Sequence, residues 1–182
     1  MVDVGRFLPL SNRPHDDESA VTSDRRAAIA EVIDEAGRLT ASASPELARL
    51  LTGDFVRDAR LTTDASASSP AGDLPALAAA VRSGKRRRTG TLVRAVRALL
   101  VLGDQLDLKP RIGGLTLGVV ALYLATSAPL ERRAVVAGHA IRATDADWQF
   151  GRGPVLEGSA LQIVRFLIGL SDTPPQPASK DS

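Results

Sequence analysis

Apolar residues recur at helical spacing through the first part of the chain. Between residues 23 and 39 they fall every three or four positions and form one stripe: Ile29, Val32, Ile33, Ala36 and Leu39. Because a stripe of this period packs against a core as an amphipathic helix, the pattern predicts a first helix here. Ser23 suits the N-cap, since its hydroxyl can accept a hydrogen bond from an unpaired backbone N–H.

A second helix is predicted from its start signal. Ser44 is a good N-cap, and Pro45 fits the first helical position because its fixed φ is already helical. We expect this helix to end near Gly53 and residues 54–61 to add another turn or two. Residues 62–72 are small and polar without a periodic apolar face, which is typical of a linker.

Three further helices are predicted after the linker. Asp73 caps the first, and the basic loop Lys85–Arg88 separates it from the second, over residues 91–106. The third, over residues 115–125, belongs to the uncharged run 112–130. Its helical part would be about 16 Å long, shorter than the ~30 Å apolar layer of a bilayer. We therefore interpret it as a buried core helix and expect no membrane span.

After Pro129 the period of the pattern changes from helical to alternating. Five alternate positions would share one face of a strand: Val135, Ala137, His139, Ile141 and Ala143. Residues 151–154 read Gly-Arg-Gly-Pro and predict a hairpin turn between two short extended pieces within 149–156. A closing helix is expected from Ser159 to Gly169.

The order of these elements predicts the fold class. Helices followed by short strands and one more helix are typical of an α+β protein. We expect a mobile tail over residues 1–20, a helical region over 21–128 and a small C-terminal α+β domain over 129–170. The Pro-rich residues 171–182 are expected to be disordered.

Composition limits the cores and sites that the chain can build. Aromatic residues make up 3% of the chain, so the core is expected to consist of Ala, Leu, Val and Ile. The absence of cysteine excludes disulfides, thiolate zinc sites and a cysteine nucleophile. A net charge of +2 is too small to indicate a nucleic-acid partner. The N-terminus lacks the pattern of a signal peptide, so a cytoplasmic location is expected.

The chain between residues 138 and 170 carries a specific order of glycines, a tryptophan and a proline. The members are Gly138, Ala143-Thr144-Asp145, Asp147-Trp148, Gly151, Gly153-Pro154, Gly158 and Ala160. This order resembles the C-terminal domain of the mycothiol-dependent maleylpyruvate isomerase family over about a fifth of the chain. The resemblance implies a sterol-carrier-type fold there, a DinB-like four-helix bundle before it, a divalent metal and the thiol mycothiol.

The metal ligands that the resemblance implies fall on unsuitable residues. Residues 53–58 keep the glycine, valine, arginine and aspartate of the family's first motif, and the following ligand position is Thr62. The other two ligand positions are Arg97 and Val101. Metals need imidazole or carboxylate lone pairs, which these residues do not offer. We therefore interpret the chain as a shortened, degenerate relative without a bound metal or cofactor, mycothiol being implied by the resemblance alone.

Three residues within residues 138–170 are candidates for ligand binding, namely His139, Asp145 and Trp148. His139 could act as a ligand or an acid/base group, although a hydrogen-bonded histidine in the core or at an edge fits its place on an apolar strand face better. Asp145 and Asp147 could mimic paired carboxylates, but loop-capping suits a turn better. Trp148 could stack on a ligand, but an anchor between the sheet and the closing helix is the simpler interpretation.

Three functional hypotheses follow from these observations. The first is a protein of the maleylpyruvate isomerase type that acts, without a metal, on a small apolar or electrophilic molecule, or serves as a partner-binding module; whether it is an enzyme stays open. The second is nucleic-acid binding through Lys85–Arg88. No aromatic residue interleaves this run, which favours a solvated, exposed loop instead. The third is a structural homodimer formed through the fourth and fifth helices.

Overall fold

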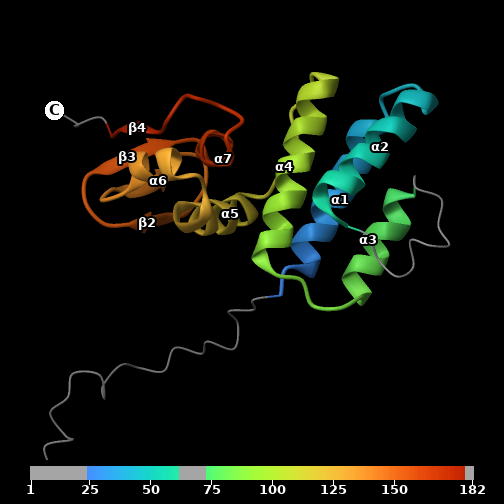
Figure 1. The fold of residues 1–182 in the computed structure, drawn as a ribbon, viewed down its shortest axis with the longest axis horizontal. Coiled ribbons are helices and arrows are strands. Elements are labelled where there is room, and N and C mark those ends of the chain that lie inside the picture. The colour runs from blue at the N-terminus through green and yellow to red at the C-terminus, as the bar shows by residue number, and fades with distance from the viewer. Residues whose placement is uncertain (1–23, 62–72, 179–182) are drawn as a thin grey trace, which may run out of the picture.

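A computed structural model describes residues 24–61 and 73–178, and it shows an α+β protein. In Figure 1 the helices α1–α4 form one lobe, and the helices α5–α7 form a second lobe together with a small sheet. We call these the helical lobe and the mixed lobe. The expected α+β class is confirmed. The predictions for residues 1–20 and 62–72, and for Ser23 and Thr62, lie outside the described residues.

The helical lobe is built from four helices. Its members are α1 (Arg26–Thr40), α2 (Pro45–Ala59), α3 (Leu74–Ser83) and α4 (Thr89–Leu106). Helix α1 packs against α3 and α4, and α2 packs against α4. The predicted stripe of α1 is buried, so the helical period identified the correct face: Ile29, Val32, Ile33, Ala36 and Leu39.

Two of these helices begin at the residues that the sequence predicted. The Ser44 hydroxyl accepts a hydrogen bond from the Leu47 N–H at 3.4 Å, and Asp73 accepts one from the Ala76 N–H at 2.9 Å. Each side chain thereby satisfies a backbone donor that the first helical turn leaves unpaired. The local capping signals are confirmed at both positions.

The second helix does not end near Gly53, but it does include the further turns expected over residues 54–61. Helix α2 continues through Gly53 to Ala59 and stops at Arg60, whose φ of 51° is left-handed. A glycine inside a helix costs about 1 kcal/mol relative to alanine. Burial of Phe55 and Ala59 beyond it offsets this cost, because apolar burial of side chains stabilises by a larger amount.

The mixed lobe contains three helices. Helix α5 (Gly114–Ser127) packs against α7 (Ala160–Ile168) and also contacts α4 and the short helix α6 (Leu130–Val136). The predicted closing helix is confirmed: the Ser159 hydroxyl accepts a hydrogen bond from Gln162 N–H at 3.1 Å, and α7 ends at a left-handed glycine. The predicted division of the chain at residue 128 stays a prediction.

The sheet of the mixed lobe has four strands in the order β2-β1-β3-β4. They are β1 (Ala140–Ala143), β2 (Gln149–Gly151), β3 (Val155–Gly158) and β4 (Gln176–Pro177). Strand β1 pairs antiparallel with β2 and parallel with β3, and β3 pairs antiparallel with β4. The sheet is therefore mixed, and β1 lies inside it.

The prediction of a hairpin at residues 151–154 is therefore wrong. The strands on either side of this turn do not pair with each other, because β1 lies between them. The true hairpin joins β1 to β2 through residues 144–148. Ile141 and its small neighbours in β1 are almost fully buried, and this burial places β1 inside the sheet.

The predicted strand between Pro129 and Ala143 is only partly present. Its first half is helix α6, and Val135 lies on that helix rather than on a strand. Pro129 holds the N-cap position of α6, and Gly138, with a left-handed φ of 75°, turns the chain toward β1. Because a proline and a glycine fix both ends, a short helix is preferred over the alternating pattern between them.

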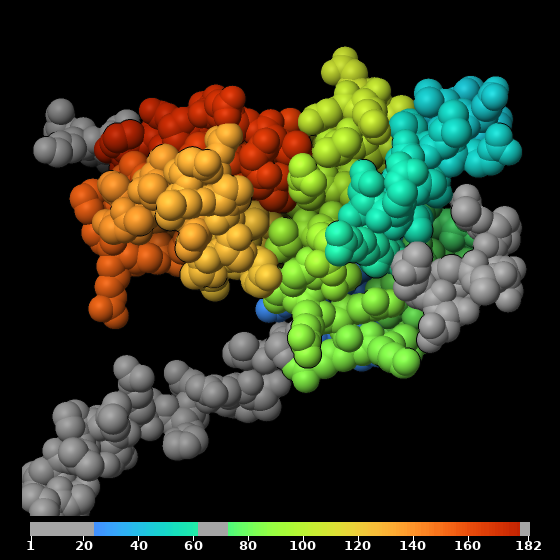
Figure 2. Space-filling view, viewed as in Figure 1, coloured from blue at the N-terminus to red at the C-terminus, as the bar shows by residue number. Residues whose placement is uncertain are grey.

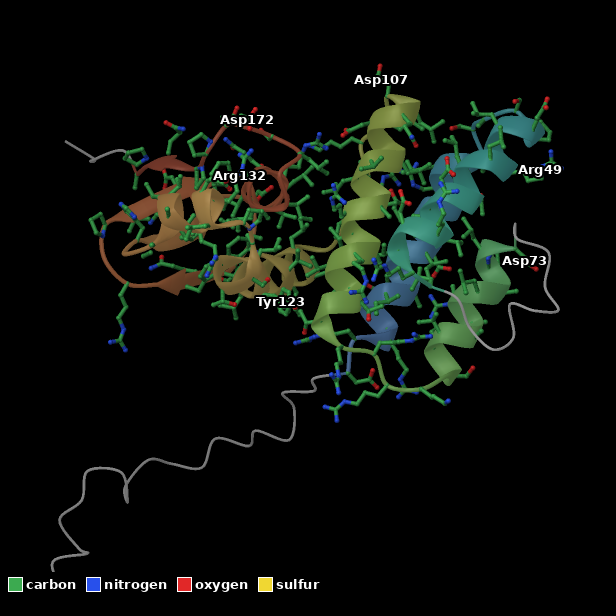
Figure 3. All side chains as sticks on the ribbon, in the orientation of Figure 1. Arg49, Asp73, Asp107, Tyr123, Arg132 and Asp172 are labelled. Carbon is green, nitrogen blue, oxygen red and sulfur yellow. The ribbon has the colours of Figure 1, made fainter. Side chains whose placement is uncertain are left out.

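The prediction that residues 171–182 are disordered is wrong for the described part, residues 171–178. Within the described residues, β4 pairs with the edge of β3, and the Arg132 guanidinium on α6 contacts Asp172 (Figure 3). Arg132 also lies over the Phe166 ring, with 4.9 Å between the guanidinium carbon and the ring centroid. These contacts hold residues 171–178 against the mixed lobe.

Helix α5 is not the fully buried core helix that its composition predicted. One face is buried and includes Leu117, Val120, Ala121 and Leu124. The opposite face leaves Leu115 81% exposed and Leu122 55% exposed. Among the described residues, no single helix is long and apolar enough to cross a membrane; α5 and α6 satisfy that test only as a pair bent by 111°.

The two lobes meet along α4 (Figure 2). One apolar cluster runs through both lobes and consists almost entirely of Ala, Leu, Val and Ile, as expected for a chain poor in aromatics. Polar contacts span the junction as well. Arg165 on α7 donates two hydrogen bonds, of 3.0 and 2.8 Å, to the Asp104 carboxylate on α4.

Candidate functional site

A cleft of about 400 Å³ lies in the mixed lobe between α6 and the β1–β2 hairpin. Its floor is apolar and includes Leu130, Val136, Ile141 and Phe150. Three basic side chains also line it, namely Arg133, His139 and Arg152. A concave apolar surface with a few convergent polar groups is the usual form of a small-molecule site, so we treat this cleft as the candidate site.

His139 is held in the cleft by a backbone contact. Its Nδ1 lies 3.0 Å from the Ala137 carbonyl oxygen. A carbonyl can only accept a hydrogen bond, so Nδ1 carries the hydrogen and Nε2 has the free lone pair in the neutral ring. The residue is half-buried and precedes β1, instead of sharing a strand face as predicted. The contact leaves Nε2 to interact with a ligand.

Two arginines supply the positive charge of the cleft. Arg133 projects from α6, and its Nη1 donates to the Thr126 carbonyl at 3.3 Å, whereas its buried Nε has no partner among the described residues. The hydrogen bond to Thr126 anchors the guanidinium, and Arg133 places positive charge in the lining of the cleft. Arg152 is exposed between Gly151 and Gly153, whose left-handed φ values shape the turn.

Trp148 lies behind the floor of the cleft and does not line it. Its Nε1 donates to the Gly114 carbonyl at 3.0 Å. Its ring stacks on Phe150 with 5.8 Å between centroids, and a Cβ placed on Gly118 would lie 2.9 Å from Trp148 Cδ1. The hydrogen bond and the close glycine place this anchor on α5, whereas the sequence suggested the closing helix.

Asp145 and Asp147 do not act as a pair. Asp145 accepts a hydrogen bond from the Ala160 N–H at 2.6 Å and thereby caps the first turn of α7. Asp147 is exposed. The loop-capping interpretation describes Asp145 correctly, and a ligand-binding role for it stays a prediction.

The residues at the expected metal-ligand positions do not fit a metal. On α4, Arg97 is exposed and Val101 has no donor atom, while Thr62 lies outside the described residues. Within residues 24–61 and 73–178 no group of three His, Asp or Glu side chains could hold an ion. We derive no metal-dependent step for this protein.

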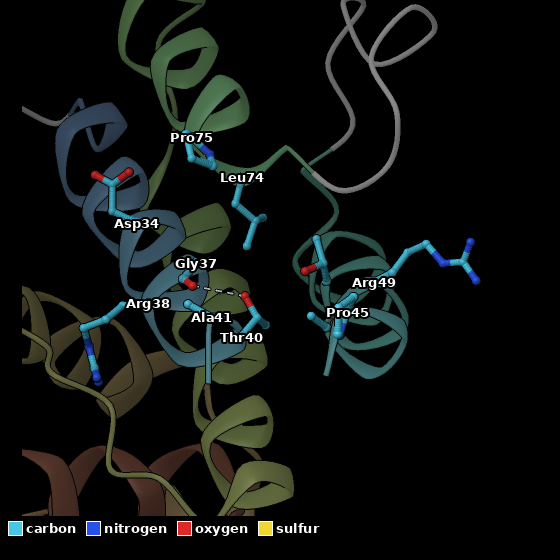
Figure 4. A pocket seen from close by; sticks show the side chains of 11 residues that line it. Asp34, Gly37, Arg38, Thr40, Ala41, Pro45, Arg49, Leu74 and Pro75 are labelled. Atoms are coloured by element: carbon cyan, nitrogen blue, oxygen red, sulfur yellow. Dashed lines mark hydrogen bonds between the residues drawn. The ribbon is translucent and has the colours of Figure 1, made fainter. Parts of the chain in front are cut away.

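A larger hollow of about 490 Å³ lies between α1, α2 and the start of α3 (Figure 4). The Arg38 and Arg49 side chains point away from it, and the Thr40 hydroxyl donates back to its own helix. Arg38 is also paired with Glu35 at 2.6 Å. Asp34 and Thr52 also line the hollow, but three basic side chains gather only at the smaller cleft, which we therefore keep as the candidate site.

Of the three residues predicted to bind a ligand, only His139 lines the cleft. Arg133 and Arg152 were not identified by sequence reasoning, because arginine accounts for most of the 23 basic residues and carries little information by itself. The position of Arg152 between two glycines was the one signal that could have identified it. Comparison of the chain with protein-family models, curated proteins and solved structures finds no match, so the family resemblance stays a prediction.

Proposed function

We propose that this protein binds a small anionic molecule with an apolar body in the cleft beside His139. One observation supports this: two guanidinium groups and an imidazole face a common apolar floor within about 400 Å³. Guanidinium groups bind carboxylates through strong, charge-assisted hydrogen bonds. The apolar floor favours a ligand that also buries hydrocarbon surface.

The geometry gives each group a role. Arg133 lines the cleft from α6 with its guanidinium anchored to the Thr126 carbonyl, and Arg152 lines it from an exposed position. The His139 Nε2 can accept from or donate to a polar group on the ligand. The resemblance to maleylpyruvate isomerases adds mycothiol, or an electrophile that reacts with it, to the ligands to be tested. We propose binding without a metal-dependent reaction.

The cleft is expected to prefer a carboxylate over its neutral amide. Trp148 is the only tryptophan and stacks on Phe150 in the floor, so its fluorescence reports on ligands in the cleft. Cyclohexanecarboxylate should change this fluorescence at lower concentration than cyclohexanecarboxamide. Arg152→Ala and Arg133→Met should each weaken carboxylate binding about tenfold, since one charge-assisted hydrogen bond contributes about 1.4 kcal/mol or more.

The control is Arg49→Ala, which removes an exposed charge on α2 that does not line this cleft. This variant should bind the carboxylate like the wild type. Equal binding of the acid and the amide, or equal weakening by the Arg49 variant, would contradict a specific carboxylate site in the cleft.

A second candidate function is homodimerisation through α5 and α6. Leu115, Leu122 and Leu130 are 81%, 55% and 72% exposed, and no residue of α5 is charged. Two copies of an uncharged, apolar helix can pack around a two-fold axis without like-charge repulsion. The exposed face of α5 supports a homodimer. The other helix of the predicted interface, α4, turns the charged Arg94 and Arg97 outward, so α6 replaces it in this proposal.

A double substitution of this face should separate the dimer. We expect the wild type to sediment as a dimer at tens of micromolar and L115E/L122E to sediment as a monomer, because each glutamate places a charge inside the apolar contact. The matched control is L47E/L50E, which changes two exposed leucines on α2. A monomeric wild type at high concentration would exclude this candidate.

A further inference from the structure

A cluster of basic side chains lies where the first turn of α1 meets the loop before α4. The Arg25 N–H donates to the Arg87 carbonyl at 3.0 Å, and Arg26 Nη1 donates to the Gly84 carbonyl at 2.6 Å. The Arg25 side chain also reaches Thr89 on α4, with 3.4 Å between Nε and Oγ1. These contacts join two segments that are far apart in the sequence. We call residues 24–26 and 84–88 the arginine corner.

The arginine corner is strongly positive, although the whole chain carries only +2. It contains six basic residues, namely Arg25, Arg26, Lys85, Arg86, Arg87 and Arg88, and one acidic residue. That residue, Asp24, accepts hydrogen bonds from the Arg26 and Arg87 N–H groups at 3.1 and 3.3 Å. Burial opposes ionisation, but these bonds and the Arg26 side chain outweigh it and lower the pKa of Asp24. Asp24 therefore organises the corner without neutralising it.

Two helices begin at this corner, which adds to its positive potential. Arg25 is the N-cap of α1 and Arg88 is the N-cap of α4, and neither side chain caps its helix. Neither helix has an acidic residue in its first turn. The start of a helix carries partial positive charge and normally attracts acidic groups. At α1 the Asp24 carboxylate already accepts the first N–H, at 3.1 Å from the Arg26 nitrogen. At α4 no acidic side chain takes this position, so the start of α4 can accept an external anion.

One unpaired donor lies at the same place. The buried Arg87 Nε has no acceptor among the described residues, and Arg87 is half-buried, in contrast to the prediction that the whole loop is exposed. Arg86 and Arg88 are exposed, as predicted. The Tyr123 hydroxyl on α5 lies against α4, since a Cβ placed on Gly90 would be 3.2 Å from it. An oxyanion bound here would receive donors from side chains and from the first turn of α4.

We propose that the arginine corner binds the phosphate groups of a compact ligand, such as pyrophosphate or a nucleoside triphosphate. Several guanidinium groups match the charge and oxygen geometry of phosphate. Single-stranded nucleic acid is bound along rows of aromatic side chains. Neither α1, the loop 84–88 nor α4 contains an aromatic residue. Tyr123 of α5 is a single ring beside α4 and does not form a row, so a compact phosphate fits this surface better than a polymer. The site is separate from the cleft beside His139 and does not depend on it.

The test is calorimetric titration of the full chain at low ionic strength with pyrophosphate, ATP, duplex DNA and single-stranded RNA. We expect pyrophosphate and ATP to bind with micromolar affinity. R86S/R88S should weaken both at least tenfold while circular dichroism stays unchanged and the melting midpoint does not fall, because both side chains are exposed and serine suits the N-cap position of Arg88. Equal affinities for pyrophosphate and ATP would assign recognition to the phosphates, and tighter ATP binding would add a contact to the nucleoside.

The matched control is R49S/R97S, which removes two exposed arginines outside the corner and should bind like the wild type. Three results would overturn the proposal. These are no pyrophosphate binding by the wild type, equal weakening in the control, and nanomolar DNA or RNA binding that R86S/R88S abolishes. The last result would identify the corner as a nucleic-acid site.

Discussion

Replacing Trp148 by alanine is expected to lower the free energy of unfolding by about 3 kcal/mol, at the lower end of the usual range for a tryptophan because the ring is half-buried. The substitution removes the stacking on Phe150 and the contact with Gly118, and it leaves the Gly114 carbonyl without its donor. These three contacts join the sheet to α5. The loss would be a sizeable share of the stability of a domain this size.

Urea unfolding followed by circular dichroism measures this effect without relying on tryptophan fluorescence. The control is Trp148→Phe, which keeps an aromatic ring on Phe150 but loses the hydrogen bond to Gly114. Trp148→Phe should lower the free energy of unfolding by only about 1 kcal/mol. If Trp148→Ala left the unfolding midpoint unchanged and calorimetric titration showed that it no longer binds the carboxylate, Trp148 would be a binding residue instead of an anchor.

Signals that act over a few residues are readable from the sequence. Ser44, Asp73 and Ser159 each sit three residues before the N–H that they satisfy, so both partners are visible in one short stretch. The helical stripe of α1 is readable for the same reason. Such interactions join residues only a few positions apart, and the regular geometry of a helix sets the spacing between them.

Features that depend on distant segments are not readable in this way. Gln176 is ordered because β4 pairs with β3. Residues 151–154 do not close a hairpin because β1 lies between the two strands that flank them. The basic groups of the cleft and of the arginine corner come together only through tertiary contacts. His139 could be singled out because histidine is rare in this chain, whereas Arg133 is one of many arginines.

Glu35 is the second residue whose replacement should have a large effect, because it links the two lobes. This α1 residue is only 9% exposed. Its carboxylate accepts hydrogen bonds from Arg38 at 2.7 and 2.6 Å, and from the Arg111 N–H at 2.6 Å, just before α5. Burial alone would raise the pKa of Glu35, but these bonds outweigh it and hold the pKa below its ordinary value of 4.5.

Glu35→Gln is therefore expected to lower the free energy of unfolding by about 2 kcal/mol at pH 7, the usual contribution of hydrogen bonds to a charged group. A carboxyl whose pKa is lowered on folding stabilises the protein above its unfolded pKa, and this stability is lost as the pH falls through the folded pKa. The difference in unfolding free energy between wild type and variant should thus be largest at pH 7 and shrink below about pH 4.5.

Urea unfolding at pH 7, 5 and 3 measures this difference. The control is Glu31→Gln, which changes an exposed carboxyl on the same helix. A difference that stays constant with pH would show that Glu35 contributes through packing instead of charge.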